Sequence, residues 1–121
     1  MTRIIAGEAR GRTIIVPAEG TRPTADRARE GLFSSLTARW GFAGSSVLDL
    51  FAGSGALGLE AASRGADEAV LVESSPDAVK IIRHNMGVVK HPGVRVQEMK
   101  VSTYLASAPR KHFDLVLARS E

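Results

Sequence analysis

The amino-acid sequence predicts an α/β fold built on a parallel sheet. Short apolar runs alternate along its 121 residues with segments of helical spacing, and each helix in such a chain returns it to the start of the next strand. One apolar run passes directly into a glycine-rich turn and then a helix start. The chain has no cysteine and is 44% hydrophobic, so it can bury a modest core without disulfides.

The N-terminal segment has the pattern of a short hairpin followed by a helix. Two apolar runs, Ile4-Ile5 and Thr13–Val16, are separated by Gly7 and Gly11. Thr24 can cap the helix that follows, which should end before residue 41. Its apolar residues recur at helical spacing: Ala25, Ala28, Leu32, Phe33 and Leu36. We expect residues 1–23 to form a basic hairpin extension and residues 24–121 to form the α/β domain.

The rest of the chain alternates strands with helices. Strands are expected over residues 45–51, 69–73, 94–98 and 112–118. Helices are expected over residues 57–64, from Ser75-Pro76 to Gly87, and, as a short turn, over residues 102–107. Serine followed by proline is a frequent helix start, and glycine a frequent helix end.

The turn Gly53-Ser54-Gly55-Ala56-Leu57-Gly58 has the G-x-G-x-x-G pattern of nucleotide-type cofactor sites. Glycines there let ligand atoms approach the backbone where a Cβ would collide. Asp49 lies in the strand before the turn. Glu73 ends the next strand, 20 residues beyond Gly53, where an acid can accept hydrogen bonds from ribose hydroxyls.

Charge favours one class of cofactor over another. Together with Glu73 the glycine pattern would fit NAD, but the carboxylate of Asp49 lies close to where a pyrophosphate rests on the helix N-terminus. S-adenosylmethionine has no phosphate, and its ammonium and sulfonium are attracted by an acid. The alternative is structural: Asp49 caps the glycine turn and Glu73 is a solvated strand end.

A longer motif upstream is more specific than the glycine turn. The chain resembles the RsmD family in Asp49–Gly65, in Arg3–Gly7 and Arg10-Gly11-Arg12, and above all in the run Thr21-Arg22-Pro23-Thr24-Ala25-Asp26-Arg27-Ala28-Arg29-Glu30-Gly31-Leu32-Phe33. Members of that family are bacterial 16S ribosomal RNA (guanine-N2)-methyltransferases that use S-adenosylmethionine. The resemblance extends from Arg3 to Ala118. It implies a Rossmann-like methyltransferase fold with an N-terminal β-hairpin that helps to hold RNA.

The resemblance also implies a cofactor site. Asp49, Gly53, Gly55 and Glu73 fall on cofactor positions of the family. The other candidate cofactor residues are Ala52, Ser54, Leu57, Gly58, Ser74, Lys100 and Val101. Lys100 is a departure, because the family offers Asp or Asn to the adenine amine there and a lysine donates where an acceptor is wanted.

The family's catalytic motif has no counterpart in the sequence. In the family, Asp-Pro-Pro-Tyr or a close variant follows the strand matched by Phe113–Ala118, whereas this chain reads Arg119-Ser120-Glu121. That motif accepts the N–H protons of the guanine exocyclic amine and stacks the base. No catalytic residue is therefore assigned, and the sheet is expected to be incomplete. Three functions stay open: a methyltransferase family member that retains the cofactor-binding half, a non-catalytic RNA-binding remnant, and a fragment of an NAD-dependent oxidoreductase.

The whole net charge of +3 lies in the first 40 residues, where all seven basic residues are arginines. A solvated surface would explain this, but the arginine fork also suits phosphate. With the resemblance, the pattern favours a phosphate track that binds 16S ribosomal RNA or the small ribosomal subunit. Its candidate residues are Arg10, Arg12, Arg22, Thr24 and Arg27.

Further features bear on location and assembly. Neither a run of 18 apolar residues nor a signal-peptide pattern occurs, so we expect a cytoplasmic protein with no membrane partner. The three histidines lack metal-ligand spacing, so no metal is expected. The strand over residues 112–118 would lack one neighbour, which predicts self-association as a two-fold dimer through an edge made apolar by Phe113, Leu115, Val116 and Leu117.

Overall fold

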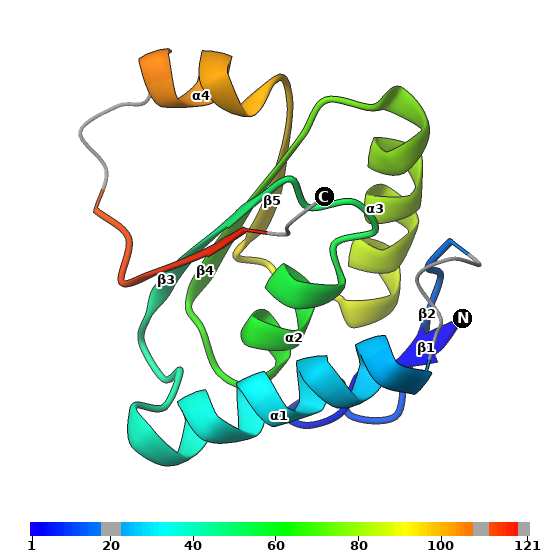
Figure 1. The fold of residues 1–121 in the computed structure, drawn as a ribbon, viewed down its shortest axis with the longest axis vertical. Helices are drawn as coiled ribbons and strands as arrows, with labels where there is room; N and C mark the ends of the chain where they lie inside the picture. The colour runs from blue at the N-terminus through cyan, green and yellow to red at the C-terminus, as the bar shows by residue number, and fades with distance from the viewer. Residues whose placement is uncertain (18–22, 108–111, 119–121) are drawn as a thin grey trace.

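The computed structural model describes residues 1–17, 23–107 and 112–118, which form a four-stranded sheet, a separate two-stranded pair and four helices (Figure 1). The strands are β1 (Thr2–Arg3), β2 (Thr13–Ile14), β3 (Ser46–Leu50), β4 (Glu68–Glu73), β5 (Val94–Glu98) and β6 (Leu115–Ala118). The helices are α1 (Pro23–Arg39), α2 (Ala56–Ser63), α3 (Pro76–Val89) and α4 (Val101–Ser107).

The strand order of the larger sheet, β5-β4-β3-β6, places the candidate site. All three pairings are parallel, so every strand ends at the same edge of the sheet. From β3 the chain moves outward through β4 to β5 and then returns to the other side of β3 for β6. The direction of winding reverses there, and the ends of β3 and β6 flank a topological switch point, where ligands bind in open α/β sheets. The expected parallel sheet and antiparallel N-terminal pair are confirmed.

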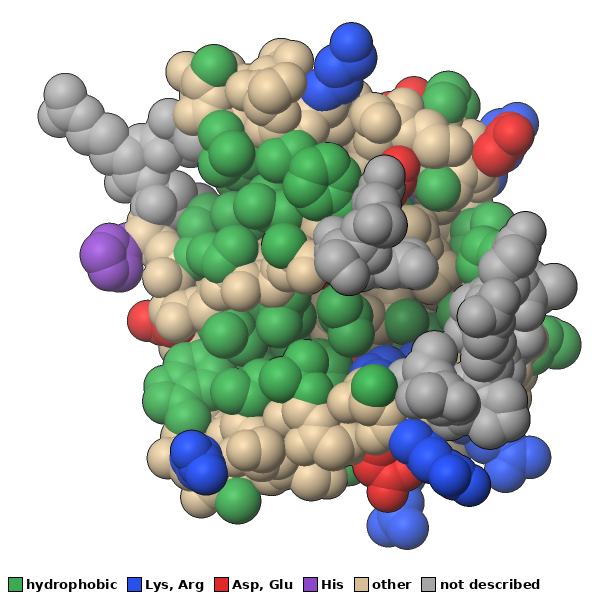
Figure 2. Space-filling view, viewed as in Figure 1, with side chains coloured by type: hydrophobic (Ala, Val, Ile, Leu, Met, Phe, Trp, Pro, Cys, Tyr) green, Lys and Arg blue, Asp and Glu red, His purple; other side chains and the backbone are tan. Residues whose placement is uncertain are grey.

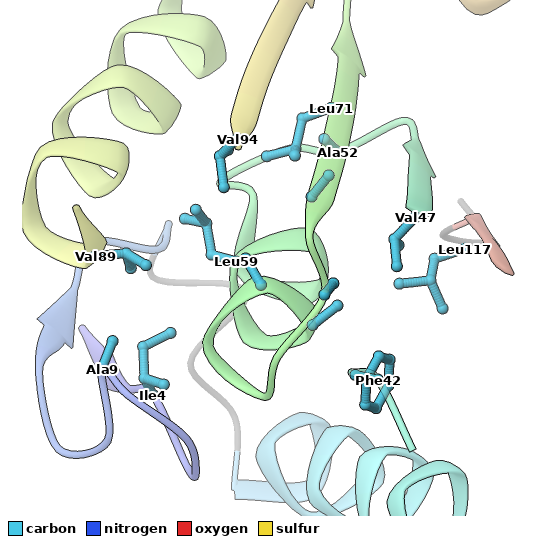
Figure 3. Close-up of a cluster of buried hydrophobic side chains, with 14 of the residues drawn as sticks. Ile4, Ala9, Phe42, Val47, Ala52, Leu59, Leu71, Val89, Val94 and Leu117 are labelled. Carbon is cyan, nitrogen blue, oxygen red and sulfur yellow. The ribbon is translucent and has the colours of Figure 1, made fainter. Parts of the chain in front are cut away.

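Alternate residues of the strands face two different hydrophobic clusters. In β4, Ala69 and Leu71 belong to the larger cluster, which packs under α1, α2 and α3, whereas Val70 and Val72 belong to a smaller one with Tyr104 of α4. This alternation is the period-two pattern of a strand buried on both faces. Figure 3 shows the larger cluster, in which Leu59 of α2 lies over the sheet.

The N-terminal hairpin belongs to the same core. Ile4, Ala9 and Ile14 are buried in the larger cluster, and in Figure 3 Ile4 and Ala9 lie beside Val89 of α3. Gly7 has a φ of 91°, and a Cβ on it would lie 1.8 Å from the carbonyl oxygen of Ser63, so only glycine fits there. The predicted boundary between residues 23 and 24 borders residues 18–22, which lie outside the described residues.

Most element boundaries differ from expectation by one to three residues. Helix α1 begins at Pro23, one residue before Thr24, and strand β6 begins at Leu115 rather than at residue 112. The prediction that α3 ends at Gly87 was wrong, because the helix continues to Val89 and closes at Lys90, whose φ is 58°. Burial of Val89 in the core outweighs the weak helix propensity of a glycine.

The edge strand β6 is less open than the sequence suggests. Leu117 is only 7% exposed because it packs in the larger cluster, near Phe42 and Val47 in Figure 3. Of the four apolar residues predicted to lie on an exposed edge, only Val116, at 52%, is exposed. Figure 2 nevertheless shows hydrophobic side chains gathered on this face of the molecule, one group towards α4 and one towards α1.

Candidate cofactor site

The glycine turn leaves β3 through an unusual backbone path. Phe51 and Gly53 have positive φ values of 58° and 62°, and Gly55, the N-cap of α2, has a φ of 84°. A hydrogen bond of 2.9 Å from Gly55 N–H to the Ala52 oxygen closes the turn. At Gly58, an added Cβ would lie 2.8 Å from Cδ1 of Leu71. This glycine therefore lets α2 pack closely on β4.

Glu73 lies against the glycine turn. Its Oε1 accepts a hydrogen bond of 2.8 Å from Gly53 N–H, and its Oε2 accepts one of 3.0 Å from Ser75 N–H. The acid is thus more than a solvated strand end, because it joins the turn after β3 to the start of α3. The side chain is half-buried at the shared edge of the sheet, next to the exposed Ser74.

Asp49 lies below the turn rather than at its rim. Its side chain is fully buried, and its Oδ2 accepts a hydrogen bond of 2.9 Å from Gly58 N–H in the first turn of α2. Asp49 therefore caps the turn, which is the structural alternative that the sequence left open. Because it is fully buried, this carboxylate is placed to act on a ligand through its charge.

The remaining predicted cofactor residues are spread around this turn. Ala52 and Ser54 are buried, and Leu57 is half-buried. Lys100 is exposed and Val101 half-buried where β5 passes into α4, and the hydrogen bond from Met99 N–H to the Glu73 oxygen, 3.0 Å long, holds this segment beside the end of β4. The structure therefore brings Lys100 to the same edge as Glu73.

Phe51 is a candidate residue that the sequence reasoning missed. It is 44% exposed and has a left-handed backbone, which is rare for a bulky side chain and clusters at functional sites. It directly follows Leu50, which is paired in register with Ala118 at the end of β6, so it lies at the switch point. An aromatic residue immediately before the glycine turn was the available signal.

Asn85, which the sequence analysis did not nominate, is fully buried behind the turn. Its side-chain amide makes three hydrogen bonds to main-chain atoms, one of them to the carbonyl oxygen of Ser54 in the glycine turn. A polar residue beside a helix's apolar stripe was the only trace of this in the sequence.

The predicted RNA-binding arginines differ in what they contact. Arg10 and Arg27 are exposed. Arg12 is also exposed, and it donates from Nη1 to the carbonyl oxygens of Val89, at 2.9 Å, and Val88, at 3.3 Å, and so caps the C-terminal end of α3. Arg22 and the side chain of Thr24 lie outside the described residues.

Arg29, which the sequence analysis did not nominate, is buried. Its Nη2 donates to the carbonyl oxygen of Arg3, at 2.9 Å, and to Oγ1 of Thr2, at 3.2 Å. This arginine ties α1 to β1 and is not a surface cation. Within the described ranges, no three histidine, aspartate or glutamate side chains gather closely enough to hold a metal ion, and no helix is long and apolar enough to cross a bilayer.

Comparison with known proteins agrees with this architecture. The family model described as conserved hypothetical protein 95 matches residues 2–118. The chain belongs to this family, the RsmD family. Ribosomal RNA small subunit methyltransferase D of Escherichia coli is 41% identical to it over 111 residues, which cover 91% of this chain and 55% of that protein.

Two solved structures superpose closely on this chain. A hypothetical protein of Thermus thermophilus is 42% identical with a TM-score of 0.85, covering 98% of this chain and 68% of that one. A putative methyltransferase of Escherichia coli is 43% identical with a TM-score of 0.76, covering 87% of this chain and 56% of that one. The fold is therefore that of the S-adenosylmethionine methyltransferases, and the chain spans little more than half the length of the Escherichia coli relative.

Proposed function

We propose that this chain forms the cofactor-binding and RNA-docking half of an S-adenosylmethionine-dependent methyltransferase that acts on the exocyclic amine, N2, of a guanine in 16S ribosomal RNA. The observation that carries the proposal is the joint placement of Glu73 and Asp49 on the glycine turn, one at its rim and one beneath it. The relatives' names supply the substrate class.

Asp49 favours S-adenosylmethionine over a dinucleotide. Its Oδ2 lies 2.9 Å from Gly58 N, so the negative charge stands against the first turn of α2, where a pyrophosphate would have to rest. A buried carboxylate repels that dianion and attracts the ammonium and sulfonium groups of S-adenosylmethionine, which carries no phosphate. The same geometry disfavours the NAD-dependent alternative.

Glu73 is suited to hold a ribose. An ionised carboxylate offers about four lone-pair directions, and the N–H groups of Gly53 and Ser75 occupy two of them. The others can accept ribose hydroxyls at the edge of the sheet. Phe51 presents an aromatic side chain at the same edge, beside the end of β6. When bound, the sulfonium supplies the methyl group, and these residues would fix where it lies.

On the RNA side, the proposed phosphate track is led by Arg10 and Arg27, which are exposed on the hairpin and on α1. Arg22 and Thr24 remain proposed members by resemblance. Arg12 contributes differently, because its hydrogen bonds to Val88 and Val89 secure the hairpin to α3. Contacts between arginines and RNA phosphates position the RNA without selecting a base.

Calorimetry with S-adenosylhomocysteine and with NAD tests the cofactor proposal. We expect the first ligand to bind more tightly, and Glu73→Ala to weaken it by about 1.5–3 kcal/mol through loss of hydrogen bonds to a charged group. Glu98→Ala is the matched control, because Glu98 is an exposed acid paired in register with Glu73 at the end of the neighbouring strand. Tighter binding of NAD, or equal effects of the two substitutions, would contradict the proposal.

A methyl-transfer assay tests whether these 121 residues bind the cofactor without catalysing the reaction. We expect a polypeptide of these 121 residues to transfer a tritiated methyl group to undermethylated small ribosomal subunits only at background, because positioning and proton-accepting groups supply several powers of ten in rate. Robust turnover would show that the 121 residues contain their own proton acceptor.

A further inference from the structure

The buried amide of Asn85 connects two parts of the chain that are far apart in sequence. Its Oδ1 accepts a hydrogen bond of 2.8 Å from Ile15 N–H, and its Nδ2 donates one of 2.8 Å to the Ile15 oxygen. This reciprocal pair imitates the pairing of two β-strand residues. The second Nδ2 proton goes to the Ser54 oxygen, 2.9 Å away in the glycine turn.

Both side-chain donors of Asn85 are therefore committed, one to the end of the hairpin and one to the cofactor turn. The residue is fully buried, so water cannot replace a bond that is lost. If Ile15 moves away from α3, the amide must rotate or follow, and its bond to Ser54 changes with it.

Other contacts anchor the hairpin without reaching the turn. Ser63 of α2 accepts a hydrogen bond of 2.9 Å from Ala9 N–H and donates one of 2.7 Å to the Ala6 oxygen. Arg12 caps α3 at Val88 and Val89. Of these contacts, the one through Asn85 also includes an atom of the glycine turn.

We propose that Asn85 is a positioning residue that couples the N-terminal hairpin to the cofactor turn, so that ligand binding at the turn orders Ile15 and displacement of Ile15 weakens ligand binding. The meaning of this coupling for catalysis rests on the proposed function, since the hairpin is the proposed RNA-docking element. Such coupling is reciprocal by thermodynamic necessity.

Hydrogen exchange in the unliganded protein gives the first test. We expect Asn85→Ala to speed exchange of the Ile15 amide and also of the Gly55 amide, which closes the turn onto Ala52. Ser63→Ala is the control: it should speed exchange at Ala9 and leave Gly55 unchanged. Unchanged Gly55 exchange in Asn85→Ala would overturn the coupling whether or not the protein binds a cofactor.

Ligand binding gives the second test. We expect Asn85→Ala to weaken S-adenosylhomocysteine about tenfold and Ser63→Ala to change its affinity less than twofold. If Asn85→Ala does not fold, the wild-type protein serves instead: saturating S-adenosylhomocysteine should slow exchange at Ile15 but not at Ala9. Equal effects at these two amides would overturn the proposal, whereas a wild-type protein that fails to bind the probe would contradict the proposed function instead.

Discussion

The carboxylate of Glu60, buried in α2, accepts a hydrogen bond of 2.9 Å from the main-chain N–H of Ile5, 55 residues earlier in the chain. Its second oxygen accepts from Ala6 N–H at 3.1 Å and from Nε of Arg64 at 2.9 Å. One acidic side chain thus holds the N-terminal hairpin on the helix that begins at the glycine turn. Hairpin and cofactor turn are parts of one packed unit.

Glu60→Gln should therefore destabilise the whole fold. The amide group would face an N–H donor at Ile5 or Ala6, and the buried Arg64 would lose its charged partner. Breaking a buried pair in this way costs about 3–5 kcal/mol. Urea unfolding would measure the loss. Glu30→Gln, at an exposed position of α1, should stay within about 0.5 kcal/mol of the wild type, and an equal effect of both would contradict the assigned role.

Arg10 and Arg12 should separate RNA binding from stability. Arg10→Ala is expected to weaken RNA binding and flatten its salt dependence, because a phosphate contact releases counterions, with little change in unfolding free energy. Arg12→Ala should lower the unfolding free energy by about 1 kcal/mol through loss of its bonds to α3. Filter binding across a salt series and urea unfolding test the pair. Identical profiles for the two variants would show that both arginines play one role.

Two glycines should respond oppositely to alanine. Gly87 lies inside α3 with nothing within 4 Å of an added Cβ, so Gly87→Ala should stabilise the protein by about 0.5–1 kcal/mol. Gly58→Ala places a Cβ 2.8 Å from the buried Leu71 and should cost about 1–3 kcal/mol. Thermal unfolding of both variants checks the signs. Stabilisation by Gly58→Ala would mean that α2 can shift away from β4 without loss.

Self-association through β6 remains a prediction for a polypeptide of these 121 residues. Among the residues that the structure describes, β6 pairs with β3 alone, and Val116 is exposed on it. We expect a dimer whose interface buries on the order of 1,000 Å² in total. Light scattering would show its mass.

Val116→Lys should shift that dimer towards monomer, because it places a charge on the edge. The control is Leu105→Lys, which changes an equally exposed apolar residue on α4. A monomer at high concentration, or equal effects of the two substitutions, would contradict association through β6. Leu117→Lys is not a suitable probe, because Leu117 is part of the core.

Much of the fold could be predicted from the sequence because its signals are local. The alternation of apolar strands and helices predicted the parallel sheet, and Ser75-Pro76 marked the start of α3, where Ser75 accepts a hydrogen bond from Ala78 N–H. The helix end expected at Gly87 was wrong, because a local signal does not include tertiary packing. Burial of Val89 in the core stabilises the helix by more than the low helix propensity of glycine destabilises it. The exposure expected for Leu117 was wrong, because strand periodicity does not indicate which face of the sheet packs against the core.

The sequence by itself determined the family, the glycine turn and the pair of acids, because each depends on residue types at fixed spacing along the chain. Only the tertiary structure decided that Glu73 lies at the rim of the turn while Asp49 lies beneath it, that Arg12 caps a helix, and that Asn85 links the hairpin to Ser54. The residues joined by these contacts are separated by between 9 and 77 positions in the chain. Arg12 and Asn85 form hydrogen bonds with main-chain atoms. A main-chain N–H or carbonyl leaves no mark in the sequence, so such partners appear only once the chain is packed.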